Sequence, residues 1–266
     1  MADRYTHGHH DSVLRSHRWR TAENSAGHLL DHLEPGQRLL DVGCGPGTIT
    51  LDLAARVAPG EVVGIDVAPE VVDAARAAAE AAGVAGVRFV TGDVYALDLP
   101  DASFDVVHAH QVLQHLTDPV AALVEMRRVL RPGGVLAVRD SDYGAFAWYP
   151  LDPRLDRWLE LYHQVTEHNR AEADAGRFLR SWVRAAGFTD ETLSSSTWTY
   201  ASAAERAWWG DLWAERAVAS SFAEQALEYG LSSRDELEQI SRAWRDWAAT
   251  DDGHIVLVHG EVVARR

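Results

Sequence analysis

One stretch of the chain decides its fold: Leu39-Leu40-Asp41-Val42-Gly43-Cys44-Gly45-Pro46-Gly47-Thr48. A short apolar run leads into three glycines at alternate positions, and a helical pattern follows over residues 47–57. Glycine lets the backbone come close to a ligand, because it has no Cβ. The free N–H groups at the start of a helix favour negative charge. This strand, turn and helix therefore predict a nucleotide-binding unit of the Rossmann type.

An acidic residue at a suitable distance supports this interpretation. In a Rossmann unit, a carboxylate about 20 positions further on contacts the ribose hydroxyls. Asp66 lies 19 residues after Gly47, at the end of a second apolar run. We therefore expect Asp66 to bind a ribose.

The details of the turn indicate which nucleotide is bound. The dinucleotide fingerprint G-x-G-x-x-G/A requires a small residue at position 48, where this chain has Thr48. Asp41, just before the turn, is badly placed for a pyrophosphate but suits the amino group of a methionine tail. The spacing thus favours S-adenosylmethionine (SAM) over NAD or FAD. The chain has no lysine, which also counts against an NAD-dependent oxidoreductase with a Tyr-x-x-x-Lys pair.

Beyond this unit, short apolar runs alternate with helical stretches, as in a parallel sheet covered on both faces. The strands are expected at 38–42, 61–65, 87–90, 104–109 and 135–139, with helices at 47–57, 69–83 and 119–130. Further helices are expected at 11–33, 151–171, 177–187 and 203–248, and further strands at 191–200 and 255–263. The expected fold is α/β, a doubly wound Rossmann-like sheet of seven strands with helical insertions.

Four segments, in order and at matching spacing, resemble the class I SAM-dependent methyltransferases, most closely their ubiquinone/menaquinone-biosynthesis-like branch. They are residues 39–48, 64–67, 91–94, and 104–116 together with 130–136. The resemblance implies a methyltransferase that uses SAM, with Asp66 on the ribose and Asp93 on the adenine amino group. It also implies that the leading segment folds over the cofactor.

Three regions follow from the resemblance and from the change of composition after the fifth strand. Residues 1–34 are expected to form an N-terminal helical lid segment, and residues 35–145 a SAM-binding core. Residues 146–266 would hold the rest of the sheet and the helical cap insertions at 151–171 and 203–248. Nine of the ten tryptophans lie after residue 147, so the two halves differ in composition.

Fourteen residues are expected to contact the cofactor: Tyr5, Arg20, Asp41, Gly43, Cys44, Gly45, Thr48, Asp66, Val67, Gly92, Asp93, Val94, His110 and Gln111. His110 and Gln111 follow a strand, and ligands bind beyond the carboxyl ends of parallel strands, so both should face the methionine part. Two of the residues have plainer alternatives: Asp93 as a helix cap, and Cys44 as a small buried side chain.

The N-terminal segment supplies further candidates. Tyr5 and Arg20, together with His9 and His17, are expected lid contacts or plain surface residues. His7, His9, His10 and His17 form a histidine cluster, but a metal site needs a geometry that a flexible tail seldom supplies. We therefore predict no metal. Cys44 is the only cysteine, which excludes an intrachain disulfide and a four-cysteine zinc site.

The catalytic candidates are His115, Asp142 and Tyr143. His115 is either a general base or a residue of the first helical turn. Asp142 and Tyr143 follow the fifth strand at the ligand end, with Asp140 beside them. A carboxylate there can accept a proton from the attacking group, or it can simply close a loop. We expect an in-line displacement in which orientation does most of the work and a base is needed only for a protonated acceptor.

The overall charge narrows the choice of partner. With 25 basic and 40 acidic residues the formal net charge is −15, so phosphate backbones and anionic lipid headgroups are poor partners. No apolar run is long enough to span a membrane, and residues 1–10 lack the apolar core of a signal peptide, so we expect a cytoplasmic protein. We expect this protein to be a monomer or a homodimer.

The acceptor is then expected to be a small molecule, aromatic or otherwise apolar, methylated on carbon, oxygen or nitrogen. The late tryptophans suit both core packing and an aromatic wall that takes a flat or cationic ligand. The alternative from another class is a regulatory protein that binds SAM without catalysis.

Overall fold

The computed structural model of the chain describes residues 3–8 and 10–266. Its centre is a mixed sheet in the order β3-β2-β1-β4-β5-β8-β6, with β7 also paired to β8. The first five strands are parallel, whereas β6 and β7 pair with β8 in antiparallel fashion. The strands are β1 Leu39–Val42, β2 Val62–Asp66, β3 Val87–Thr91, β4 Phe104–His110, β5 Leu130–Ser141, β6 Ala147–Tyr149, β7 Thr189–Tyr200 and β8 His254–Arg265.

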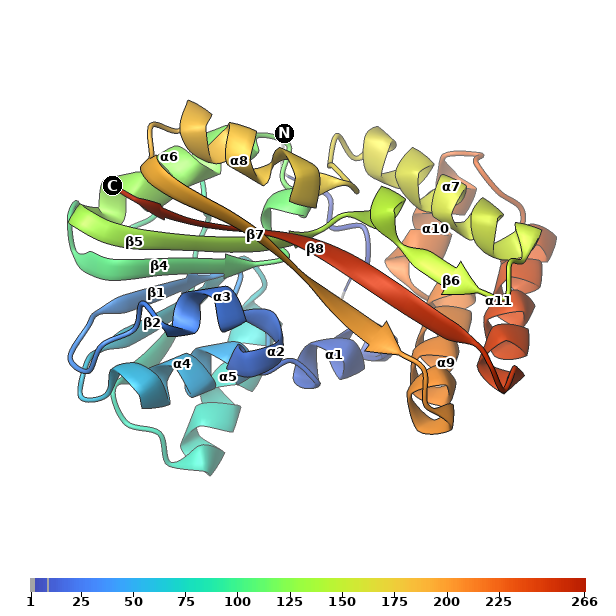
Figure 1. Cartoon of the computed structure of the whole chain (residues 1–266), viewed down its shortest axis with the longest axis horizontal. Coiled ribbons are helices and arrows are strands. Elements are labelled where there is room, and N and C mark those ends of the chain that lie inside the picture. Colours follow the sequence, from blue (N-terminus) through green and yellow to red (C-terminus); the bar gives the residue numbers. More distant parts are fainter. Residues whose placement is uncertain (1–2, 9) are drawn as a thin grey trace.

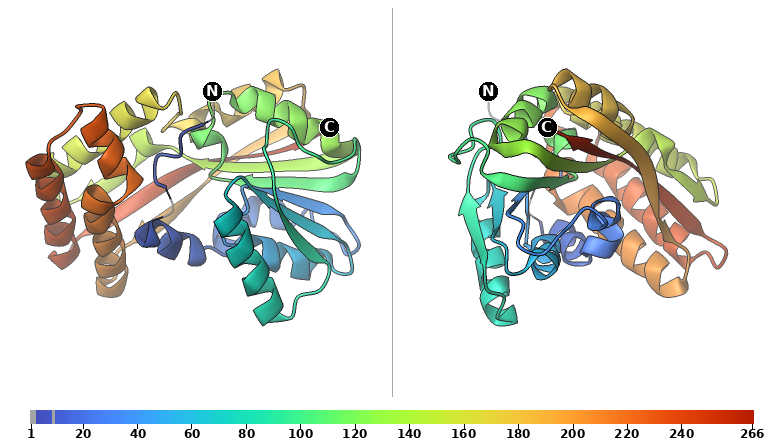
Figure 2. Two further views of the ribbon diagram at one scale, coloured as in Figure 1. Left: turned by 180° about the vertical axis from the view of Figure 1, so that it is seen from behind. Right: turned by 60° about the vertical axis from the view of Figure 1, so that its left-hand side comes forward.

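Helices cover both faces of this sheet, so the doubly wound α/β prediction is confirmed (Figure 1; Figure 2). Successive side chains of a strand point to opposite faces. Leu39 accordingly packs with Leu53 of α4, and Leu40 packs with Leu123 of α6. The covering helices are α2 Ala22–Ser25, α3 Gly27–Leu30, α4 Thr48–Val57 and α5 Pro69–Ala82 on one face, and α6 Pro119–Val129 and α8 Ala175–Ala185 on the other.

The sheet has eight strands where seven were expected. The additional strand, β6, has only three residues, too few to give an alternating pattern in the sequence. It forms because β8 begins early: Ile255 and Val256 pair with Trp148 and Ala147 in a part of β8 that lies beyond its pairing with β5.

The leading segment is broken into short helices where one helix was expected over residues 11–33. α1 spans Asp11–Arg18, and a new helix then begins at Ala22. The break follows from a capping box: the Thr21 hydroxyl accepts from Asn24 N–H, and the Asn24 side chain accepts from Thr21 N–H. This leaves Trp19 and Arg20 outside a helix.

The cap lies at the carboxyl end of the parallel strands (Figure 1). It holds α7 Pro153–His168, α9 Ala203–Ala219, α10 Ser221–Glu228 and α11 Arg234–Ala249, together with the short turns η1 Leu113–His115 and η2 Tyr143–Ala145 at its border with the core. The predicted helix 203–248 is therefore three helices. Among the described residues, no helix is long and apolar enough to cross a membrane.

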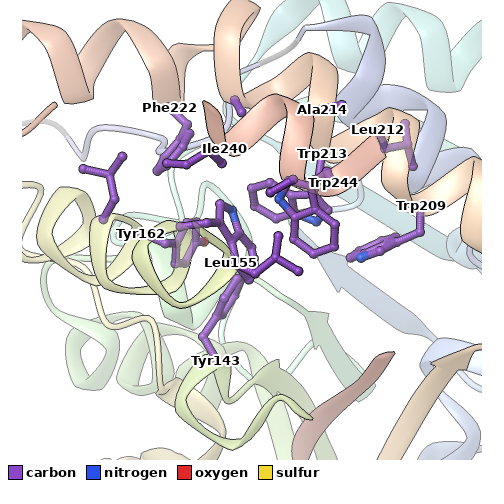
Figure 3. Close-up of a cluster of buried hydrophobic side chains, with 14 of the residues drawn as sticks. Tyr143, Leu155, Tyr162, Trp209, Leu212, Trp213, Ala214, Phe222, Ile240 and Trp244 are labelled. Carbon is purple, nitrogen blue, oxygen red and sulfur yellow. The ribbon is translucent and has the colours of Figure 1, made fainter. Parts of the chain in front are cut away.

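An aromatic cluster forms the core of the cap (Figure 3). Trp158, Trp213 and Trp244 are almost fully buried, and the ring centroid of Trp158 lies 4.6 Å from that of Trp213 and 4.9 Å from that of Trp244. Most of the late tryptophans thus serve as core packing, one of the two roles expected for them. The cluster gives the cap a rigid wall on the side that faces the sheet.

Candidate active site

A cavity of about 560 Å³ lies where the carboxyl ends of the parallel strands meet the cap and the N-terminal segment. The structure places all fourteen residues expected to contact the cofactor on its wall, from Tyr5 and Arg20 to His110 and Gln111. Two of the three catalytic candidates, His115 and Tyr143, also line it, and Asp142 does not.

The glycine turn forms one wall because it leaves no room for side chains. Gly43 has a φ of 66°, and a Cβ there would lie 2.3 Å from Cγ2 of Val112. Gly47, at the start of α4, has a φ of 83°, and a Cβ would lie 2.9 Å from Cζ of Phe89. These are backbone conformations that only glycine adopts readily. The turn is therefore a preformed cradle.

Two acidic residues stand at the ends of neighbouring strands. The Asp66 carboxylate accepts hydrogen bonds from Gly45 N–H and Ala68 N–H, both at 3.1 Å, which fixes it beside the glycine turn. Asp93 accepts from Tyr95 N–H at 2.9 Å and so shapes its own loop. Each carboxylate keeps further lone pairs for a ligand in the cavity.

Asp41 plays a different part from the one its position suggested. The residue is buried, with 2% of its surface exposed. One carboxylate oxygen lies 2.7 Å from His108 Nδ1, and the other accepts from the Thr50 hydroxyl at 2.5 Å. These bonds join β1 to β4 and α4, so both carboxylate oxygens of Asp41 are engaged within the core. His108 is fully buried.

Gln111 links three parts of the site. Its Oε1 accepts from Arg20 at 2.5 Å, and its Nε2 donates to the Ser141 hydroxyl at 2.8 Å and lies 3.0 Å from His259 Nε2. Its φ of 54° lies in the left-handed region, which is uncommon for a residue with a Cβ and is concentrated at functional sites. Burial lowers the pKa of the neighbouring His110 well below its usual value, so that ring is neutral.

Sequence reasoning did not find Ser141 and His259 in this site. They face each other across β5 and β8, and that register is a property of the antiparallel pairing. Further wall residues that were not predicted include Phe146, Tyr200, Arg216 and Leu257. No sequence motif marks them.

His115 and Tyr143 stand where cofactor and cap walls meet. Burial lowers the pKa of His115 to about 3, with the Arg20 charge as a second cause, so the ring is neutral. Burial raises the pKa of Tyr143, whose hydroxyl therefore stays protonated. The Tyr143 ring stacks on Tyr162 at 4.0 Å, and both hydroxyls approach His7 Nε2, at 3.4 and 3.0 Å.

The carboxylate of Asp142 is engaged elsewhere. Arg177 Nε donates to it at 2.8 Å and Arg177 Nη2 gives a second bond, so the pair is bidentate. Asp142 thus fastens the end of β5 to α8, which is the loop-closing alternative for this residue. Asp140 is fully buried, and burial raises its pKa to about 8.

Two members of the N-terminal histidine cluster lie on the cavity wall, His7 and His17. The His17 carbonyl accepts from the Thr48 hydroxyl at 3.3 Å, which joins α1 to the start of α4. His9 lies outside the described residues. In residues 3–8 and 10–266 no three metal-binding side chains come together.

Comparisons with known proteins agree with this geometry. Residues 33–197 match a protein family described as a methyltransferase domain. An uncharacterized methyltransferase of Schizosaccharomyces pombe is 33% identical over 98% of this chain and 96% of its own length. A demethylmenaquinone methyltransferase of Thermus thermophilus is 43% identical over 38% of this chain and 46% of its own length.

A solved structure shares the fold. It is the phosphoethanolamine N-methyltransferase 2 of Haemonchus contortus in complex with SAM, with a TM-score of 0.55 and 19% identity. The similarity covers 88% of this chain and 49% of the other.

Proposed function

We propose that this chain, which belongs to the class I SAM-dependent methyltransferases, methylates a small molecule that is flat or otherwise apolar. SAM is the cofactor of the family. What we propose is the chemical class of the acceptor and the in-line course of the methyl transfer.

The proposed function rests on one observation: the same cavity is lined by the cofactor motifs and by residues of the cap. One end has the glycine turn, Asp66 and Asp93. The other has Phe146, Trp208 and Trp209, whose rings suit a flat aromatic acceptor. The cavity volume of about 560 Å³ is within the usual range for small-molecule sites, roughly 300–1,000 Å³.

The residues of the first end fit SAM. The glycine turn lets the backbone approach a ligand in the cavity closely, Asp66 suits the ribose hydroxyls, and Asp93 suits the adenine amino group. Arg20, held by Gln111 at the end of β4, suits the carboxylate of the methionine part. The N-terminal segment would then act as the lid, since α1 and the residues before it close this end of the cavity.

When bound, SAM supplies a methyl group on a sulfonium, which is already an activated leaving group. The chain therefore needs to bring the acceptor into line and to exclude water, effects that contribute on the order of 7–11 kcal/mol in favourable cases. Neutral His115 can donate a hydrogen bond to the acceptor from Nδ1, because its Nε2 accepts from the Gln114 amide nitrogen at 3.0 Å. This Nδ1 is buried and has no partner among the described residues. The protonated Tyr143 hydroxyl can donate one. Both are proposed as positioning groups.

Isothermal titration with SAM and with S-adenosylhomocysteine (SAH) tests the cofactor site, with Asp66→Asn as the matched variant. Asn keeps the size of the side chain but loses the charge and one acceptor. We expect micromolar binding that weakens at least tenfold in the variant. A screen of phenols, indoles and quinols for methyl transfer then tests the acceptor class. Binding of neither ligand by the native chain, or transfer only to polar aliphatic acceptors, would contradict the proposal.

A further inference from the structure

Two arginines in the cavity wall lack an acidic partner. Arg216, on α9 in the cap, is 4% exposed, and Arg20 lines the same cavity from the N-terminal segment. Among residues 3–8 and 10–266, no carboxylate lies within 4.0 Å of either guanidinium. Burial lowers the pKa of Arg20 to about 10, and the charge of Arg216 lowers it further while Tyr5 opposes this.

Other deeply buried arginines of the chain lie near a carboxylate. Arg139 is 1% exposed and lies 3.2 Å from a carboxylate oxygen of Glu261. Arg206, which is also on α9, is 5% exposed, bonds to the Ala201 carbonyl and reaches Asp251 at 4.0 Å. A buried charge without a counter-charge costs several kcal/mol, so a chain seldom keeps one without a use for it.

Arg216 is also held in a fixed position. Its Nη2 donates to the Ser12 carbonyl at 2.8 Å and to the Ser16 hydroxyl at 2.6 Å, both on α1. Its guanidinium carbon lies 5.2 Å from the ring centroid of Trp213. Its Nε is buried and has no partner among the described residues. Its Nη1 makes no hydrogen bond to the described residues and is not buried, so the N–H donors of this nitrogen are left for a ligand in the cavity that Arg216 lines.

The two arginines come from different walls of the cavity. Arg20 is bonded to Gln111 at the carboxyl end of β4, beside the cofactor motifs. Arg216 comes from α9 in the cap, where its guanidinium lies over the Trp213 ring. The cofactor brings one carboxylate, which suits Arg20, and this leaves Arg216 for an anionic group of the acceptor.

We infer that the acceptor is an aromatic carboxylic acid whose carboxylate is bound by Arg216. The inference rests on the proposed function, because it concerns the acceptor end of the same cavity. The aromatic walls take the ring, and the Nη1 group of Arg216 donates to a carboxylate oxygen. This assigns Arg216 as a specificity-determining residue that acts on the acceptor and leaves the cofactor to Arg20.

The test compares acids with their methyl esters, which have the same ring but no charge. The probes are 2-naphthoate, indole-3-carboxylate and 4-hydroxybenzoate, titrated calorimetrically into the protein saturated with SAH, which cannot donate a methyl group. We expect at least one acid to bind about ten- to a hundredfold more tightly than its ester. If no acid binds more tightly than its ester, or no acid binds at all, the inference is wrong.

Matched variants assign the effect to one residue. In Arg216→Gln the preference for the acid should fall to about one, and in Arg206→Gln, which removes a buried guanidinium from the same helix outside the cavity, it should persist. A preference that survives in folded Arg216→Gln overturns the inference. If thermal unfolding shows that this variant is not folded, Arg216→Lys replaces it: a point charge without the guanidinium should lower the preference severalfold, and an unchanged preference contradicts the assignment.

The binding of SAH separates this inference from the proposed function. If the native chain does not bind SAH, the proposed function fails and the acceptor question falls with it. If SAH binds with unchanged affinity in Arg216→Gln while the acids and esters bind alike in the native chain, only the present inference fails.

Discussion

Arg20 Nη2 donates a hydrogen bond of 2.5 Å to Gln111 Oε1, and this bond ties the segment before β1 to the carboxyl end of β4. The same glutamine reaches Ser141 on β5 and His259 on β8 through its amide nitrogen. The backbone of Gln111 is in the left-handed conformation. Its side chain thus links the ends of β4, β5 and β8 with the N-terminal segment, around the end of the site expected to bind the methionine part.

Removal of this side chain should weaken the cofactor site. In Gln111→Ala, Arg20 loses its support, and we expect the affinity for SAM to fall about tenfold, the typical value of a hydrogen bond to a charged group. Gln111→Gly is the matched variant, because it loses the same bonds but relieves the strain of the positive φ. Its free energy of unfolding should exceed that of the alanine variant by about 1 kcal/mol. Titration calorimetry and urea unfolding measure the two effects, and unchanged SAM affinity in both variants would refute the role of Gln111.

The glycine cradle predicts a sharp difference between two glycines. Gly43→Ala places a Cβ 2.3 Å from Val112 Cγ2 in addition to the strain of its φ of 66°, so we expect SAM binding to be lost and stability to fall. Gly36 has a φ of 90° but open space around it, so Gly36→Ala should cost only about 1 kcal/mol and leave binding intact. Equal SAM affinities for the two variants would argue against a closely fitting turn.

Asp140 makes stability depend on pH. Burial raises its pKa to about 8 in the folded chain, against about 3.9 in an unfolded one. Between about pH 4 and pH 8 the unfolded chain therefore binds fewer protons at this site, and stability falls as pH rises. Asp140→Asn stays neutral and still accepts from Gln114 N–H, so it should be more stable than the native chain at pH 8, by on the order of a few kcal/mol, and little different at pH 4. Urea unfolding at both values checks this, and a difference that does not vary with pH would be inconsistent with it.

His115 should act without titrating. Because burial lowers its pKa to about 3, the ring stays neutral from pH 5 to pH 8. Once an acceptor is known, kcat/KM of the native enzyme should show no inflection from a histidine in that range. His115→Ala should lower kcat/KM by about ten- to a hundredfold through lost orientation, and His115→Asn should restore part of it. An inflection near pH 6.5 that disappears in the variant would instead identify His115 as a titrating base.

The sequence predicted the structure best at positions where only one residue type meets the physical requirement. The glycines of the turn and Asp66 at its distance predicted β1, α4 and a carboxylate beside the turn, because the backbone of such a turn tolerates no other residue. The contact of Asp66 with a ribose remains a prediction. The alternating runs likewise predicted the parallel strands to within a few residues, apart from the start of β5.

The remaining site residues could not be predicted, because their roles depend on the direction in which neighbouring side chains point. Asp140, Ser141 and Asp142 are consecutive, and successive side chains of a strand point to opposite faces. Ser141 meets the cavity, whereas Asp142 meets Arg177 on α8. The sequence shows this alternation but not which face is the cavity, so it pointed to Asp142, whereas Ser141 is the one of the three that lies on the cavity wall. Arg216 lies in a helix whose contacts depend on how the cap sits on the sheet, and no local pattern encodes that. The cytoplasmic location and the monomer or homodimer remain predictions.

The long strands β7 and β8 have a consequence for how ligands reach the cavity. Each has twelve residues and runs without interruption from the sheet into the cap (Figure 1). A hinge between core and cap would have to break their shared ladder of hydrogen bonds, so we expect the two halves to move together. We therefore expect ligands to enter and leave past the N-terminal segment, which is built of short helices and carries Arg20. Since α1 also bonds Arg216 through Ser12 and Ser16, a displacement of this segment would release the contacts that position both arginines.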